Sequence, residues 1–166
     1  MHITTLLASM RNWPISAAVR GDLLGTDWLF PIIETVHVIA LTLVIGSIAM
    51  VDLRLLGIAS RSSPASRLLV EVLPWTWIAW CSAAISGTLL FISKADVYAR
   101  NTQFELKFVV MGLAAVNMLI FHFGAYRQIE QWDSAEPPLG AKTAGALSLV
   151  LWIGVVFFGR WIGFTT

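Results

Sequence analysis

The sequence predicts an all-α integral membrane protein, a four-helix bundle with up-down-up-down topology. Apolar side chains make up 57% of the 166 residues and charged ones only 13%, against roughly a quarter charged in an average soluble domain. So few charges cannot coat a soluble globule of this size. Four apolar runs also reach the length of about 20 residues that a membrane-spanning helix needs. Short connectors between the runs favour antiparallel neighbours.

The four expected spans are Leu29–Val51, Pro74–Ser93, Phe104–Tyr126 and Thr143–Phe164. The expected connectors are Arg54–Val72, Lys94–Gln103 and Arg127–Lys142. The first connector contains the turn-forming basic stretch around Arg61, Ser62 and Ser63, and the third contains the Pro137-Pro138 breaker, which should end the third helix well before the fourth. Residues 29–166 therefore form the transmembrane domain.

Residues 1–28 form a separate segment. Ile3, Leu6, Leu7 and Met10 recur at helical spacing, and Trp13-Pro14 interrupts the pattern. A basic start, an uninterrupted apolar core and a clear cleavage site are lacking, so a signal peptide is not expected. We expect an amphipathic helix on the membrane surface, with a disordered tail as the alternative.

Charge and cysteine content exclude other classes. The net charge is +1 without a basic cluster, which argues against a nucleic-acid partner. Cys81 is the single cysteine, so no disulfide scaffold is present. Basic residues are more numerous in the first connector than elsewhere, which favours an N-terminus outside the cytoplasm. Four tryptophans near span ends suit the membrane interface: Trp28, Trp75, Trp77 and Trp161.

Ionisable residues inside the spans are the candidate functional residues, because charge is costly in a bilayer. They are Glu34, His37, Lys107, His122 and Arg160, with Asp52 at the end of the first span. Helical geometry places Glu34, His37 and Asp52 on one face, which should point into the bundle. His37 comes early in its span and His122 late in a parallel one, so the two should lie near opposite membrane surfaces.

The surroundings of His37 suggest haem. At its level the other helices offer Ser86, Gly87, Met111 and Gly154, and the small residues among them leave room for a flat ligand. Lys94, Lys107, Arg160 and Glu34 lie slightly nearer the surface. An imidazole can ligate iron, and the cations can hold propionates. Glu34 could orient the imidazole or pair with Arg160. Metal ligation is therefore expected at His37, and at His122 if a second haem binds.

Structural roles remain open for the same residues. A histidine in a membrane helix can simply hydrogen-bond a neighbouring helix, and Glu34 can form an ion pair with Arg160 or Lys107. His122 shares a face with Met111 and can equally belong to a packing cluster or to a proton or quinone site. The Gly159-x-x-x-Gly163 pair suits close packing or contacts in a homo-oligomer.

Four segments carry a family resemblance: LFPIIETVHVIALTLVIGSIAMVDLRLLG, PWTW, FELKF with the later N-x4-H, and LSLVLWIGVVFFGRWIGF. They resemble an uncharacterised family of small bacterial four-helix membrane proteins. The chain is more distantly similar to bacterial membrane protoporphyrinogen oxidase, copper-resistance membrane proteins and b-type membrane haemoproteins. By resemblance, Val36-His37-Val38-Ile39-Ala40 takes the place of a haem-serving first-span motif. Lys107 and His122 look like the third-span positions of the oxidase, whose flanking pattern the chain does not keep.

These observations predict a b-type haem-binding protein of the bacterial inner membrane, with a periplasmic N-terminus. It would carry out electron transfer or bind and sense a diatomic gas, using one haem b or two. Its partners would be lipid, haem and a quinone or other redox partner. The alternatives are a protoporphyrinogen-oxidase-like enzyme, a copper-handling protein and a structural protein without cofactor. Whether the chain is an enzyme stays open.

Overall fold

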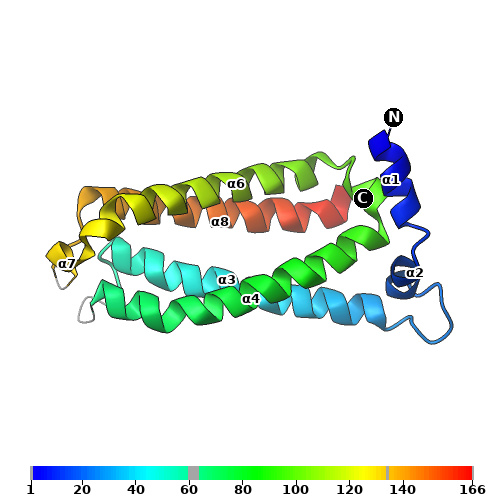
Figure 1. The fold of residues 1–166 in the computed structure, drawn as a ribbon, viewed down its shortest axis with the longest axis horizontal. Helices are drawn as coiled ribbons and strands as arrows, with labels where there is room; N and C mark the ends of the chain where they lie inside the picture. The colour runs from blue at the N-terminus through cyan, green and yellow to red at the C-terminus, as the bar shows by residue number, and fades with distance from the viewer. Residues whose placement is uncertain (1, 60–63, 134, 166) are drawn as a thin grey trace.

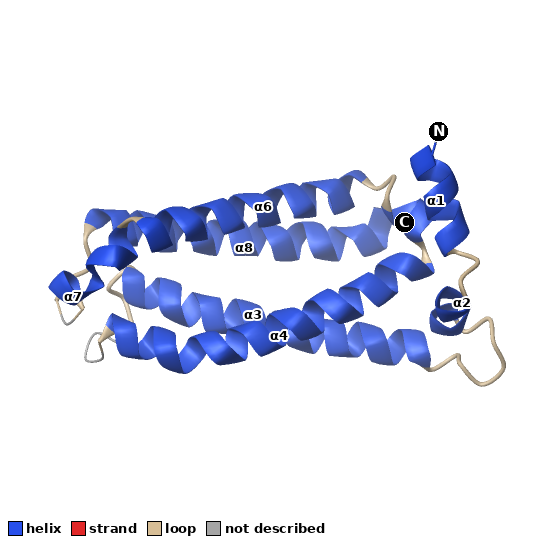
Figure 2. Cartoon of the chain, viewed as in Figure 1, coloured by secondary structure: helices blue, strands red, loops and turns tan. Residues whose placement is uncertain are grey.

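The computed structural model describes residues 2–59, 64–133 and 135–165, and their regular structure is helical throughout. Four long helices form a bundle (Figures 1 and 2). They are α3 (Leu29–Leu55), α4 (Ala65–Ser93), α6 (Thr102–Phe123) and α8 (Leu139–Thr165). The short helices are α1 (His2–Met10), α2 (Pro14–Arg20), α5 (Ala95–Tyr98), η1 (Ala125–Gln128) and α7 (Ile129–Trp132). The expected all-α four-helix bundle is confirmed.

The bundle consists of two antiparallel pairs. Helix α3 packs along α4, α6 packs along α8, and the contact of α3 with α8 joins the pairs (Figure 1). Gly145 permits this crossing, because a Cβ at that position would lie only 3.0 Å from the Asp52 carbonyl oxygen. Near the opposite end, Phe91 of α4 stacks on Phe104 of α6 with 5.3 Å between ring centroids.

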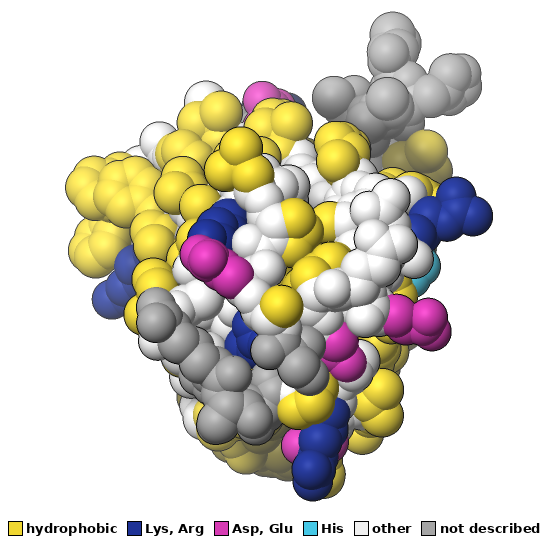
Figure 3. All heavy atoms as spheres, turned by 90° about the vertical axis from the view of Figure 1, so that its left-hand side faces the viewer, with side chains coloured by type: hydrophobic (Ala, Val, Ile, Leu, Met, Phe, Trp, Pro, Cys, Tyr) yellow, Lys and Arg dark blue, Asp and Glu magenta, His cyan; other side chains and the backbone are white. Residues whose placement is uncertain are grey.

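Burial is distributed as in a membrane protein. The large apolar side chains Leu43, Ile78 and Ile120 are 59%, 61% and 67% exposed. Small residues instead fill the contacts between helices, as membrane helices require for close approach: Ala40, Ala79, Ala83, Ala114 and Ala144. Seen from the end in Figure 3, charged side chains gather on the end face while hydrophobic ones cover the sides. Each of the four long helices is long and apolar enough to cross a membrane, so this is a multi-pass membrane protein.

The helix boundaries differ from the sequence prediction most at the first connector. The second span begins at Ala65 rather than Pro74, and Pro74 lies inside α4, as membrane helices tolerate. Helix α3 continues to Leu55, so the first connector is much shorter than expected. Its predicted turn residues Arg61, Ser62 and Ser63 lie outside the described residues. The Pro137-Pro138 breaker is confirmed, because α8 begins directly after it.

The N-terminal segment forms two helices across one end of the bundle (Figure 1). The predicted break is confirmed, since α1 ends at Met10 and α2 begins at Pro14. Ser16 donates a hydrogen bond to the Ile92 carbonyl at 3.0 Å, and Arg20 donates one to the Ser93 carbonyl at 3.2 Å. These bonds fasten α2 to the end of α4.

The other end is held by a polar network between connectors. Asp133 accepts hydrogen bonds from the backbone and hydroxyl of Ser66, and its carbonyl accepts one from the buried Arg54 at 3.0 Å. Burial opposes ionisation of Asp133, but the Ser66 donors and the Arg54 charge outweigh it and lower the pKa of this carboxyl. Asp133 thereby caps the N-terminus of α4 from a distant segment.

Candidate functional site

His37 is half-buried and points from α3 into the contact with α4. Its Nδ1 lies 3.0 Å from the hydroxyl oxygen of buried Ser86. That hydroxyl donates its own proton to the Ser82 carbonyl at 2.6 Å, so its oxygen accepts the proton of Nδ1. The backbone of Ala83 is a further hydrogen-bond partner of the His37 side chain. A neutral imidazole that carries its proton on Nδ1 has its lone pair on Nε2.

Gly87 makes room for this imidazole. A Cβ built on Gly87 would lie 2.8 Å from Cε1 of His37 and 3.4 Å from Nδ1. Any larger residue here would push the ring away from Ser86. The sequence prediction that Ser86 and Gly87 lie at the level of His37 is confirmed.

Lys107 reaches the same level from α6. Its ammonium lies against Gly159 of α8, with Nζ 3.4 Å from a Cβ built there, and its charge acts on the His37 imidazole. Among the described residues Lys107 forms no salt bridge. All four spans thus contribute to one level, which we call the His37 layer: His37, Ser86, Gly87, Lys107 and Gly159.

The remaining predicted residues of this end lie outside the His37 layer. Lys94 and Arg160 are exposed, and each packs over a phenyl ring, at 5.8 Å from the Phe30 centroid and 5.2 Å from the Phe164 centroid. Met111 is half-buried one turn further along α6 than Lys107. Gly154 packs against Val110 rather than lining the layer.

The expected inward orientation of Glu34 is wrong. Its side chain is exposed, and within the described ranges it forms no salt bridge with Arg160 or Lys107. Glu34 lies in the second turn of α3. Burial raises the pKa of Tyr98 in α5, and the negative charge of Glu34 adds to this.

Asp52 does point inward, but far from Glu34. It is 5% exposed, and Ser148 of α8 hydrogen-bonds its carboxyl. The other oxygen, Oδ2, has no hydrogen-bond partner in the described part of the chain. Glu34 and Asp52 share a helical angle by sequence spacing, yet only Asp52 is covered, by α8 at Gly145.

His122 lies at the opposite end of the bundle from His37, as the sequence predicted, because α3 and α6 run parallel (Figure 1). It is exposed and stacks on Tyr126 with 5.1 Å between centroids and 17° between planes. The structure therefore does not bring the two histidines together. A metal-binding role for His122 stays a prediction.

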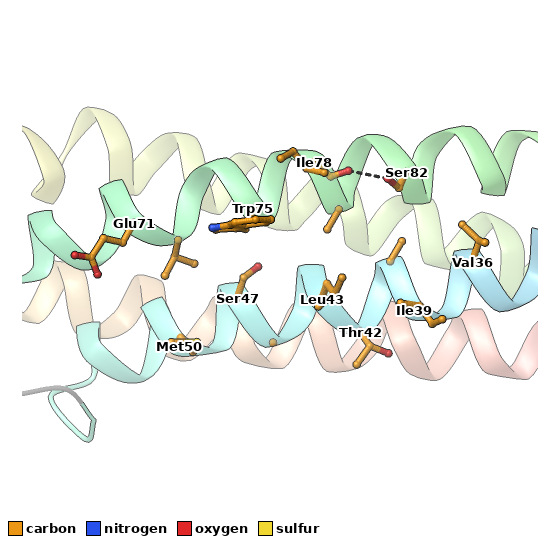
Figure 4. A pocket seen from close by; sticks show the side chains of 14 residues that line it. Val36, Ile39, Thr42, Leu43, Ser47, Met50, Glu71, Trp75, Ile78 and Ser82 are labelled. Atoms are coloured by element: carbon orange, nitrogen blue, oxygen red, sulfur yellow. Dashed lines mark hydrogen bonds between the residues drawn. The ribbon is translucent and has the colours of Figure 1, made fainter.

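An outer groove runs between α3 and α4 (Figure 4). It has a volume of about 620 Å³, and apolar side chains such as Leu43, Ile78 and Trp75 line it. None of the predicted site residues faces it. Among the described residues, no three histidine, cysteine or acidic side chains converge on a position that could hold a metal ion.

Comparison with protein families matches residues 28–165 to a family of unknown function, DUF6644. The chain belongs to this family. The match spans α3 to α8 and thus includes the whole His37 layer. No curated protein and no solved structure matches the chain. Because the family is one of unknown function, membership assigns no reaction or ligand to the His37 layer.

Gly159 was missed as a member of the layer. In the sequence Gly159 stands out only as one glycine of a Gly-x-x-x-Gly pair. The other glycine, Gly163, is not in a close contact, because no atom lies within 4 Å of a Cβ built on it. Comparing the depths of Lys107 and Gly159 in antiparallel spans would have paired them. The Asp133 cap has no comparable signal, because 67 residues separate it from Ser66.

Proposed function

We propose that this protein binds haem b in the membrane, and that His37 would supply the protein ligand of its iron. The observation that supports this most is the hydrogen bond of Nδ1 to Ser86, because a partner on one imidazole nitrogen fixes the other as a metal ligand. Neutral imidazole is also the usual protein ligand of haem iron. The donor set therefore fits the group.

The other members of the His37 layer suit a flat anionic ligand. Lys107 supplies a positive charge without an acidic partner among the described residues, and a propionate is the anion it would hold. Arg160 and Lys94 are exposed at the same end and would hold the propionates from the wet side. Met111 would contact the ring one turn deeper.

Bound haem would supply an iron that exchanges one electron or binds a diatomic gas. The residues of the chain would do the rest. Ser86 would hold the imidazole in its ligating tautomer, Gly87 would leave the space for it, and Lys107 would neutralise a carboxylate inside the bilayer. We therefore propose electron transfer or binding of a diatomic gas as the function.

The visible absorption spectrum of the purified protein tests this proposal. After expression with ample haem, the wild type should show the strong absorption band of bound haem, and His37→Ala should lose it. His122→Ala is the matched control, an exposed histidine at the other end, and should keep the band. A wild-type protein without the band, or a His37→Ala protein with an unchanged one, would contradict the proposal.

We further propose that the protein lies in the bacterial inner membrane with its N-terminus in the periplasm. Arg54, Arg127 and Lys142 belong to the end opposite α1, which supports a cytoplasmic location of that end. Single cysteines introduced at Arg100 and at Arg127 in a Cys81→Ser background would test this. An impermeant thiol reagent applied to intact cells should label only position 100, and the reverse pattern would refute the orientation.

A further inference from the structure

An open cavity lies at the surface at the end of α6, away from the His37 layer. It has a volume of about 480 Å³, and it is lined by His122, Phe123, Tyr126 and Arg127. Stacking on Tyr126 and an edge contact with Phe123 at 5.6 Å orient the His122 ring. The cavity therefore combines an oriented imidazole, a phenol and a guanidinium.

The polar groups of this cavity are available to a ligand. Within the described ranges, neither the His122 imidazole nor the Arg127 guanidinium makes a hydrogen bond or an ion pair. The acids of this end are engaged elsewhere: Asp133 with Ser66 and Glu136 with Lys142. The exposed Glu130 forms no ion pair with Arg127. The cavity is therefore suited to an anion.

The position of the cavity identifies the kind of anion. Helix α6 has 22 residues, about 33 Å at 1.5 Å per residue, which matches a hydrocarbon core about 30 Å thick. Its last residues thus lie at the level of the lipid headgroups. Directly below the cavity, three exposed side chains recur at helical spacing on the lipid-facing surface: Val116, Leu119 and Phe123. A polar cavity above an apolar strip matches a phospholipid.

We propose that this site, the α6 lipid site, binds an anionic phospholipid. Arg127 and His122 would contact the phosphate, Tyr126 would donate its hydroxyl to the headgroup, and one acyl chain would follow Val116 and Leu119. Basic residues at the cytoplasmic membrane surface bind anionic headgroups in this way. The inference is independent of haem, because none of these residues belongs to the His37 layer.

Native mass spectrometry of the full-length protein tests the site. The protein is mixed with equal amounts of phosphatidylglycerol and phosphatidylcholine that carry the same acyl chains, and retained lipid is counted. The wild type should prefer phosphatidylglycerol about five-fold, the effect of one basic residue near an anionic surface. Arg127→Gln should remove most of the preference, and Arg127→Lys should keep part of it. The matched control Arg100→Gln, at the other membrane boundary, should leave the preference unchanged.

Three results would overturn the α6 lipid site. The first is equal retention of both lipids by the wild type, and the second is an unchanged preference in Arg127→Gln. The third is stabilisation by inorganic phosphate alone to the same extent as by phosphatidylglycerol, which would indicate a free-anion site. If Arg127→Gln does not fold, as judged by its helical circular dichroism, His122→Gln replaces it and should reduce the preference at least two-fold. An unchanged preference in His122→Gln would then refute the site.

Discussion

The contact between Gly87 and His37 leads to a prediction that does not depend on any ligand. Gly87→Ala places a Cβ 2.8 Å from Cε1 of His37, at least 0.6 Å closer than the 3.4 Å at which ordinary contact begins. Overpacking of this kind costs about 1–3 kcal/mol. Replacing a helical glycine by alanine also stabilises by up to about 1 kcal/mol. The net effect should therefore be a loss of about 0–3 kcal/mol.

Gly112→Ala is the matched control. Gly112 is a helical glycine too, in α6, and nothing lies within 4 Å of a Cβ built on it. This variant should show only the stabilising propensity effect of up to about 1 kcal/mol. The difference between the two variants measures the clash, and it should be about 1–3 kcal/mol.

A double-mutant cycle assigns the clash to the imidazole. In a His37→Ala background the obstructing ring is absent, so Gly87→Ala should become as favourable as Gly112→Ala. The free energy of unfolding can be followed by circular dichroism during titration with a denaturing detergent. If Gly87→Ala proves as stabilising as Gly112→Ala with His37 in place, or if removing His37 changes nothing, the packing described for the His37 layer is refuted.

Three other substitutions test the bundle. Asp133→Asn should destabilise the protein by about 1–2 kcal/mol in detergent denaturation, because the α4 cap loses its charge. Since the pKa of Asp133 is lowered, the difference in stability between wild type and variant should shrink as the pH falls below about 4. A pH-independent difference would contradict the cap. Asn117→Ala removes a buried hydrogen bond of 2.9 Å to α8, so the free energy of unfolding should fall by about 1–3 kcal/mol. The control Thr88→Ala, at an exposed position, should change it by less than about 0.5 kcal/mol. Lys107→Met should stabilise the haem-free protein while lowering haem affinity, whereas destabilisation without haem would assign Lys107 a packing role.

The spans and the setting of His37 could be predicted because both follow from helical geometry. The length of the apolar runs predicted the four helices. The different depths of His37 and His122 along parallel helices predicted that the two histidines lie at opposite ends of the bundle. The same reasoning placed Ser86 and Gly87 beside His37. Each of these inferences uses positions within a helix, which 1.5 Å and 100° per residue determine closely.

The predictions that failed depended on which neighbour covers a face. Glu34 and Asp52 share a helical angle, yet α8 crosses α3 at Gly145 and buries only Asp52. Likewise Arg160 packs over Phe164 instead of pairing with Glu34. The extension of α4 before Pro74 was missed because a proline usually marks a helix start, whereas a membrane helix can continue through it.

Lys107 has no salt-bridge partner in the described part of the chain, and this is a further reason to expect a ligand in the His37 layer. A lysine near the centre of a membrane helix costs about 2.5–3.5 kcal/mol, and part of that cost applies to a half-buried lysine one turn inside α6. A structural role would place a carboxylate beside it, and Glu34 is within one turn of His37 but turns outward. The charge faces glycine and a neutral imidazole instead. An anionic group supplied from outside the chain would offset the cost, and His37 would hold the rest of that ligand.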